Sequence, residues 1–145
     1  MHVFIDSSVL PKSVGFGSYL VLDSIDLTNP IDPNSIKSRI QTIKLNSTTS
    51  TDAELELAIY VLTNIADIKY LYTDCNNLYS LTSRNIKNTN RNLDKYNSII
   101  ELLKGIELIK VKGHKKKDLQ VNNYDKIFSY VDKQARQTLR NYRST

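Results

Sequence analysis

The stretch HVFIDSSVLPKSVGFGSYLVL, residues 2–22, decides the fold that this chain adopts. Two apolar runs, at 2–9 and 14–22, lie on either side of Pro11-Lys12-Ser13, and this arrangement predicts a β-hairpin. Two glycines alternate in the second run and leave one face of that strand without side chains. The bare face indicates tight packing or, as the alternative, close approach of a ligand to the backbone.

Beyond the hairpin, apolar residues recur at strand spacing and at helical spacing, in the order of an α/β protein. The sequence has no internal repeat, so we expect residues 1–145 to form a single domain. The order of elements predicts a mixed sheet flanked by helices. Strands are expected near 38–45, 69–73 and 106–111, helices over 51–66, 76–82, 93–103 and 123–142, and loops over 23–35 and 82–92.

Length and composition restrict the class of protein. A chain of 145 residues can form one core, and 40% hydrophobic with 24% charged residues is typical of a globular protein. The formal net charge of +5 weakly favours polyanionic partners. The single cysteine excludes an intramolecular disulfide and is consistent with a reducing compartment.

The sequence has no feature of a membrane or secreted protein. No apolar stretch approaches the ~18 residues of a membrane span. The N-terminus begins directly with the strand-like run rather than with a signal peptide. We therefore expect a cytoplasmic protein, and the sequence predicts no protein partner.

Asp6 stands inside the first apolar run, where aspartate is uncommon. A buried carboxylate destabilises a protein unless a cation or hydrogen bonds compensate for the lost water. Asp6 is therefore a candidate functional residue. The alternative is that Asp6 ends the strand and caps a turn at Ser7-Ser8.

Two further carboxylates, Glu54 and Asp74, each have a structural and a functional interpretation. Glu54 borders the apolar face of the first long helix, but Thr51-x-x-Glu54 also matches a capping box. Asp74 follows a strand, at the end where active sites of open α/β sheets gather. It could instead cap the helix that begins near Asn76.

Asp132 is the fourth candidate. It lies in line with Phe128 and Leu139 on the apolar stripe of the last helix, where aspartate is disfavoured. As the alternative, Asp132 pairs with Lys133 or Arg136 at the edge of that stripe.

Four carboxylates in these positions match the needs of two-metal phosphodiester hydrolysis. Two divalent ions about 4 Å apart can activate a water and stabilise the attacking and leaving oxygens. Hard carboxylate oxygens favour Mg²⁺, or Mn²⁺ as a substitute. Zinc is disfavoured, because His2 and His114 are far apart in the sequence and no Cys/His cluster occurs.

Four segments, spread from residue 4 to residue 136, carry these residues. They are Phe4-Ile-Asp6, Ser50-Thr-Asp-Ala-Glu54-Leu-Glu-Leu-Ala58, Tyr72-Thr-Asp74-Cys-Asn, and Val111-Lys-Gly-His114 followed by Val131-Asp132-Lys-Gln-Ala135-Arg136. In their order and surroundings the chain resembles the ribonuclease H family, type 1. Lys-Gly-His after a strand, with Asp-x-x-Ala-Arg on the next helix, is the most specific part of the resemblance.

The resemblance implies an RNase H-like sheet in the order 3-2-1-4-5 and hydrolysis of the RNA strand of an RNA/DNA hybrid, with 5′-phosphate and 3′-hydroxyl products. By position it implies that Asp6 contacts both Mg²⁺ ions and that Asp132 completes the nucleophile-side site. Glu54 and Asp74 would hold the leaving-group-side ion. His114 would assist proton transfer or product departure; without the resemblance it would be interpreted as a solvated loop residue.

Small polar and basic residues are the expected contacts with nucleic acid. The resemblance places two of them where the family contacts the DNA strand, and the others lie beside Asp6 or in basic predicted loops. The candidates are Ser7, Thr49, Ser50, Arg84, Lys87, Lys112 and Lys115.

Some features depart from the family's pattern. Cys75 stands where a serine is usual, His114 and Asp132 are further apart than in common bacterial members, and the chain has no tryptophan for a basic handle. The last helix has a basic stripe, which we interpret as a solvent-exposed face: Lys126, Lys133, Arg136, Arg140 and Arg143.

Two other functions fit the same expected fold. One is a DNA nuclease or resolvase-like enzyme, against which Lys-Gly-His argues. The other is a catalytically silent nucleic-acid-binding module, which would be expected to have lost acidic residues. All four are present.

Overall fold

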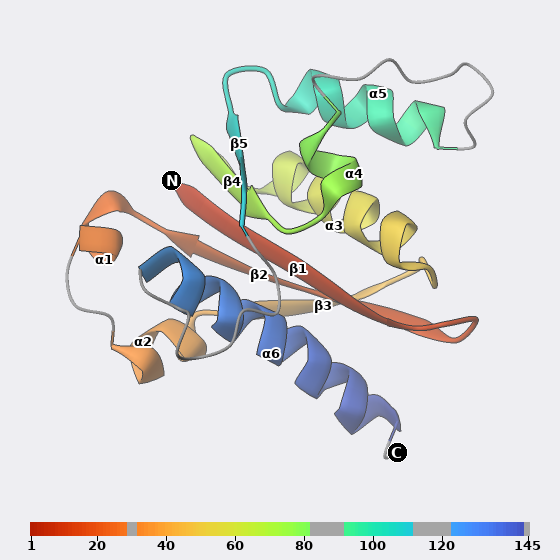
Figure 1. Ribbon diagram of the computed structural model, residues 1–145, viewed down its shortest axis with the longest axis horizontal. Helices are drawn as coiled ribbons and strands as arrows, with labels where there is room; N and C mark the ends of the chain where they lie inside the picture. Colours follow the sequence, from red (N-terminus) through yellow and green to blue (C-terminus); the bar gives the residue numbers. More distant parts are fainter. Residues whose placement is uncertain (29–31, 82–91, 112–122, 144–145) are drawn as a thin grey trace.

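The computed structural model describes residues 1–28, 32–81, 92–111 and 123–143 (Figure 1). Five strands form one mixed sheet in the order β3-β2-β1-β4-β5, which confirms the predicted topology. The strands are β1 (His2–Leu10), β2 (Val14–Leu22), β3 (Gln41–Leu45), β4 (Tyr70–Thr73) and β5 (Glu107–Lys110). The helices are α1 (Ser24–Thr28), α2 (Pro33–Ser38), α3 (Ser50–Asn64), α4 (Asn76–Tyr79), α5 (Leu93–Leu102) and α6 (Asn123–Arg143).

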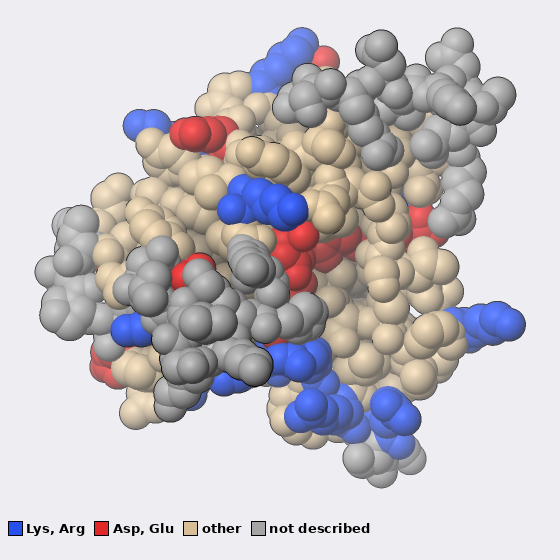
Figure 2. Space-filling model, in the orientation of Figure 1, with Lys and Arg blue, Asp and Glu red and all other residues tan. Residues whose placement is uncertain are grey.

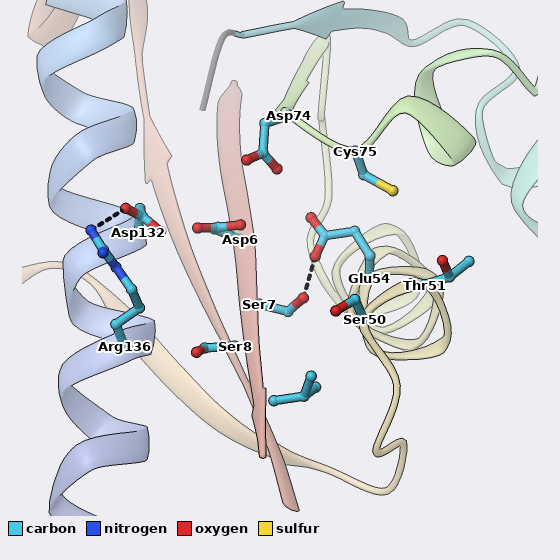
Figure 3. Close-up of a pocket in the computed structure, with 11 residues that line it drawn as sticks. Asp6, Ser7, Ser8, Ser50, Thr51, Glu54, Asp74, Cys75, Asp132 and Arg136 are labelled. Atoms are coloured by element: carbon cyan, nitrogen blue, oxygen red, sulfur yellow. Dashed lines mark hydrogen bonds and ion pairs between the residues drawn. The ribbon is translucent and has the colours of Figure 1, made fainter. Parts of the chain in front are cut away.

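Helices cover both faces of the sheet (Figure 1). α3 and α5 lie over one face and α6 crosses the other. Side chains alternate along β1, so Ile5 belongs to the core beneath α3 whereas Phe4 belongs to the core beneath α6. The same alternation directs Asp6 toward α6 and Ser7 toward α3, as the close-up in Figure 3 shows.

β1 extends well beyond its neighbour β4. It pairs with β2 from His2 to Leu10 but with β4 only from His2 to Phe4. The remaining part of β1 therefore has an open edge, at the carboxyl ends of the parallel strands. Because no strand separates the two faces there, side chains from α3 and α6 can meet. Asp6 lies inside this strand, so the interpretation of Asp6 as its last residue is wrong.

The two glycines of β2 allow close packing. A Cβ at Gly17 would lie 2.7 Å from Leu57 Cδ1, and a Cβ at Gly15 would lie 2.5 Å from the Ser47 carbonyl oxygen. Both distances are shorter than real contacts, so the packing interpretation is confirmed. Gly17 in particular lets α3 lie deep against the sheet.

The loop predicted over 23–35 is wrong in part, because two short helices form there. Asp23 Oδ1 accepts a hydrogen bond from the Asp26 amide, and Asp26 Oδ2 accepts one from the Asp23 amide, so α1 has a reciprocal cap. Asp32 accepts from the Asn34 amide and Pro33 begins α2. As a result β3 begins at Gln41 rather than near 38. None of the helices in the described ranges is long and apolar enough to cross a membrane.

Candidate active site

The four predicted carboxylates line one pocket of about 390 Å³ at the open edge of β1 (Figure 3). Asp6 comes from β1, Glu54 from the second turn of α3, Asp74 from the residue after β4, and Asp132 from the middle of α6. The structure therefore brings together side chains that are up to 126 positions apart in the sequence.

Asp6 lies at the centre of this arrangement. Its exposure is only 6%. Burial raises the pKa of its carboxyl group well above the ordinary value, and the charge of Glu54, a hydrogen bond with Asp132 and the charge of Asp74 raise it further. Asp6 therefore interacts with all three other carboxyl groups.

Glu54 is buried even more deeply, at 3% exposure. Its carboxylate accepts hydrogen bonds from Ser7 Oγ and, at 3.4 Å, from Thr73 Oγ1. Burial raises the pKa of Glu54 to about 7; the charge of Asp74 adds to this rise and the two hydroxyl donors oppose it. Thr49 is the N-cap of α3 and makes no side-chain capping bond, so the capping-box interpretation of Glu54 is wrong.

Asp74 is half-buried and follows Thr73 directly. The N-cap of α4 is Cys75, so the interpretation of Asp74 as that cap is wrong. Carboxylate oxygens of Asp6, Glu54 and Asp74 lie within 4.8 Å of one another. These three groups could hold a metal ion.

Asp132 has a cationic partner within its own helix. Arg136 Nη2 donates to Asp132 Oδ2 at 2.7 Å, so the expected alternative, a pair with Arg136, is present in the structure. Asp132 is nevertheless only 6% exposed and still lines the pocket. Arg136 lines it too, which the sequence did not predict.

The donor set fits a hard divalent cation. All three close groups are carboxylates, and such oxygens are the ligands preferred by Mg²⁺ and Mn²⁺. Burial first and neighbouring carboxylates second raise the pKa values of Asp6 and Glu54, and both effects disfavour a negative charge that a bound cation would stabilise. His2, the one histidine in the described part of the chain, lies instead in an aromatic cluster with Tyr70 and Tyr72.

The predicted nucleic-acid contacts have mixed positions. Ser50 lines the pocket, whereas Thr49 is exposed and is not among the lining residues. Ser7 lines the pocket but donates to Glu54. His114 and four basic candidates lie outside the described residues, so their roles stay predictions: Arg84, Lys87, Lys112 and Lys115.

Thr73 was not predicted to be part of the site. Its hydroxyl is fully buried, donates to Glu54 and accepts from the Cys75 amide at 3.1 Å. Its one signal in the sequence is a polar residue at the end of an apolar strand, directly before a candidate carboxylate. That signal does not identify Glu54 as its partner.

Known structures resemble this fold. RNase H1 from the halophilic archaeon Halobacterium salinarum NRC-1 matches with a TM-score of 0.64 at 15% identity, over 94% of this chain and 97% of that chain. The foamy viral protease–reverse transcriptase in complex with RNA/DNA hybrid matches with a TM-score of 0.67 at 13% identity, over 94% of this chain. The native structure of prototype foamy virus protease–reverse transcriptase matches with a TM-score of 0.62 at 16% identity, over 94% of this chain.

The matched region is 19% and 20% of the two foamy virus chains, so this chain spans about a fifth of their length. No protein-family model and no curated protein sequence matches. The expected likeness to ribonuclease H is thus confirmed at the level of fold. The chain has the RNase H-like fold.

Proposed function

We propose that this chain is an endoribonuclease that hydrolyses the RNA strand of RNA/DNA hybrids and leaves 5′-phosphate and 3′-hydroxyl ends. The observation that carries the proposal is the convergence of Asp6, Glu54, Asp74 and Asp132 in one pocket, beside the unpaired edge of β1 and the carboxyl end of β4. The fold alone would not be sufficient, because unrelated functions share folds.

Each carboxylate has a proposed role. Asp6 interacts with all three others and would help to hold both of two Mg²⁺ ions, for which Mn²⁺ could substitute. Glu54 and Asp74 are assigned to the leaving-group side and Asp132 to the nucleophile side. Ser7 and Thr73 fix the Glu54 carboxylate by hydrogen bonds and so reduce the motion of this group.

Divalent ions held by these groups would supply the positive charge that activates a water and stabilises the leaving oxygen. The chain's own residues exclude water and contact the substrate. Burial excludes bulk water from Asp6 and Glu54, and the pocket wall formed by Ser50 and Thr51 is available to polar groups of the substrate. Preference for a hybrid would depend on contacts with RNA 2′-hydroxyl groups and on groove shape.

Cleavage of an end-labelled RNA/DNA hybrid with Mg²⁺ tests the proposal, beside double-stranded RNA, double-stranded DNA and an EDTA control. Cuts confined to the RNA of the hybrid are expected. Cuts in DNA would instead indicate a DNA nuclease. Binding without any cleavage in Mg²⁺ or Mn²⁺ would indicate a silent binding module.

A further inference from the structure

The C-terminal half of α6 continues away from the pocket with a strong positive charge. Residues 133–143 include four cations and no aspartate or glutamate. From sequence alone we interpreted these cations as part of a solvent-exposed face. The continuous helix α6 sets the side on which they lie relative to Asp132. The four are Lys133, Arg136, Arg140 and Arg143.

Three of these cations share the side of α6 that carries Asp132. At 3.6 residues per turn, Arg136, Arg140 and Arg143 lie within about 80° of Asp132 around the helix axis. Arg140 and Arg143 are exposed. In the space-filling view, blue side chains gather over this half of α6, next to the red acidic cluster (Figure 2).

Arg136 connects the pocket to this surface. One nitrogen, Nη2, donates to Asp132, while Nε is buried and has no hydrogen-bond partner within the described residues. The side chain as a whole is 41% exposed. Because the side chain is partly exposed, its guanidinium can still donate to an incoming phosphate oxygen, and such charge-assisted hydrogen bonds are strong.

We propose that Arg136, Arg140 and Arg143 form a basic track that binds successive backbone phosphates of the nucleic acid on one side of the cut. The proposal rests on the proposed function, because it takes the pocket as the place of cleavage. Asp132 and Arg143 are eleven positions apart, which is about 16 Å along a helix. A duplex advances about 3.4 Å per base pair, so Arg143 lies roughly five base pairs from Asp132.

Binding provides the first test. Fluorescence anisotropy is measured in an Asp6→Asn background, with Mg²⁺, on a hybrid of roughly 18 base pairs, which allows several times the span of the track. Arg140→Gln with Arg143→Gln should weaken binding about tenfold at low salt. It should also reduce the slope of log K against log salt by about 2, because each lost phosphate contact removes about 0.9.

The matched control is Lys37→Gln with Lys104→Gln, which removes two exposed charges elsewhere, on α2 and just after α5. It should leave the slope nearly unchanged. If both double variants change the slope equally, the track is only part of the general positive charge and the proposal is wrong.

Flank length provides the second test. A duplex with one short ribonucleotide run fixes the place of cleavage. The DNA flank on each side is varied separately and is about two or about eight base pairs long. These lengths lie below and above the distance from Asp132 to Arg143. The Arg140/Arg143 double variant should raise KM only when the flank on one side is long, with kcat unchanged. An equal rise in KM for every flank length would contradict the proposal that these residues bind the nucleic acid on one side of the cut.

The two proposals remain separable. If the wild type cuts no hybrid, the proposed function is wrong. The binding test still shows whether Arg140 and Arg143 contact phosphates. If the hybrid is cut normally and the salt slope of the Arg140/Arg143 variant equals that of the control, only the track fails.

Discussion

Asp6 is the residue in which burial and negative charge conflict most directly. Three other carboxyl groups interact with it, and burial removes most of its water. Such a residue lowers stability in the metal-free protein, and a bound cation, as we propose, would offset this cost. The contacts of Asp6 thus support the proposed functional role over a structural one, and they join residues that are distant in the sequence.

Replacement of Asp6 by asparagine tests this assignment. Asp6→Asn keeps the size of the side chain and removes its charge, so Mg²⁺-dependent cleavage should fall at least about 100-fold, the effect of losing several kcal/mol of charge stabilisation. Binding of the hybrid should remain measurable by anisotropy. Cleavage at the wild-type rate would contradict the metal-binding role of Asp6.

Ser7 should act through Glu54. Because Ser7 Oγ donates to the Glu54 carboxylate, Ser7→Ala should raise the Mg²⁺ concentration needed for half-maximal cleavage about tenfold, the lower range for lost partners of metal ligands. Ser8→Ala is the matched control, because Ser8 also lines the pocket but its hydroxyl points away from Glu54 (Figure 3). Ser7→Thr keeps the hydroxyl and should restore much of the metal affinity. Equal effects of Ser7→Ala and Ser8→Ala would show that Ser7 does not support metal binding through Glu54.

At the level of elements, the depth at which α3 packs decides where Glu54 lies. Gly17 allows this depth, since an added Cβ would lie 2.7 Å from the side chain of Leu57, which is fully buried. Gly17→Ala should therefore lower the free energy of unfolding by about 1–3 kcal/mol, as overpacking does. It should also weaken Mg²⁺ binding, because α3 must shift and Glu54 shifts with it.

Gly105→Ala is the control for this change. Gly105 has φ of +81° and open space around the Cβ position, so alanine there costs stability through backbone strain alone. Chemical denaturation should detect both variants, whereas only Gly17→Ala should change the Mg²⁺ concentration at half-maximal cleavage. An unchanged Mg²⁺ requirement in Gly17→Ala would show that α3 does not set the position of Glu54.

The elements also show what the sequence could predict. Apolar periodicity was sufficient for β1, β2 and the long helices, because their buried faces are set by local spacing. It missed α1 and α2, which depend on aspartate caps in a segment without apolar spacing. It left Glu54 and Asp74 open between capping and function. The contacts that bear on this choice are those of Glu54 with Ser7 and Thr73 and the approach of Asp74 to Asp6, and each joins residues far apart in the sequence.

At the scale of the whole molecule, the site exists because β1 is longer than β4. The sheet separates the cores beneath α3 and α6 along most of its area, and only beyond Phe4 can groups from both faces meet. Pairing lengths of this kind are not encoded in the period of one strand. This explains why the sequence could name the four carboxylates as candidates, while their arrangement in one pocket needed the structure.

The buried carboxylates should also make the metal-free protein less stable as pH rises. The pKa of Glu54 is raised from 4.5 to about 7, and that of Asp6 is raised too, so the folded state binds more protons than the unfolded state over this range. Stability should therefore be highest below about pH 4.5 as far as these groups are concerned. It should fall as pH rises toward 7, by an amount on the order of 3 kcal/mol for Glu54.

Urea denaturation in EDTA from pH 5 to pH 8 measures this effect, and Glu54→Gln isolates it, because glutamine does not titrate. The wild type should lose stability relative to Glu54→Gln as pH rises, and added Mg²⁺ should restore it at pH 8, since the ion binds the folded state. Parallel pH profiles of the two proteins would mean that ionisation of Glu54 does not cause the loss of stability. A wild type that Mg²⁺ fails to stabilise at pH 8 would mean that the pocket does not bind the ion, whatever its fold.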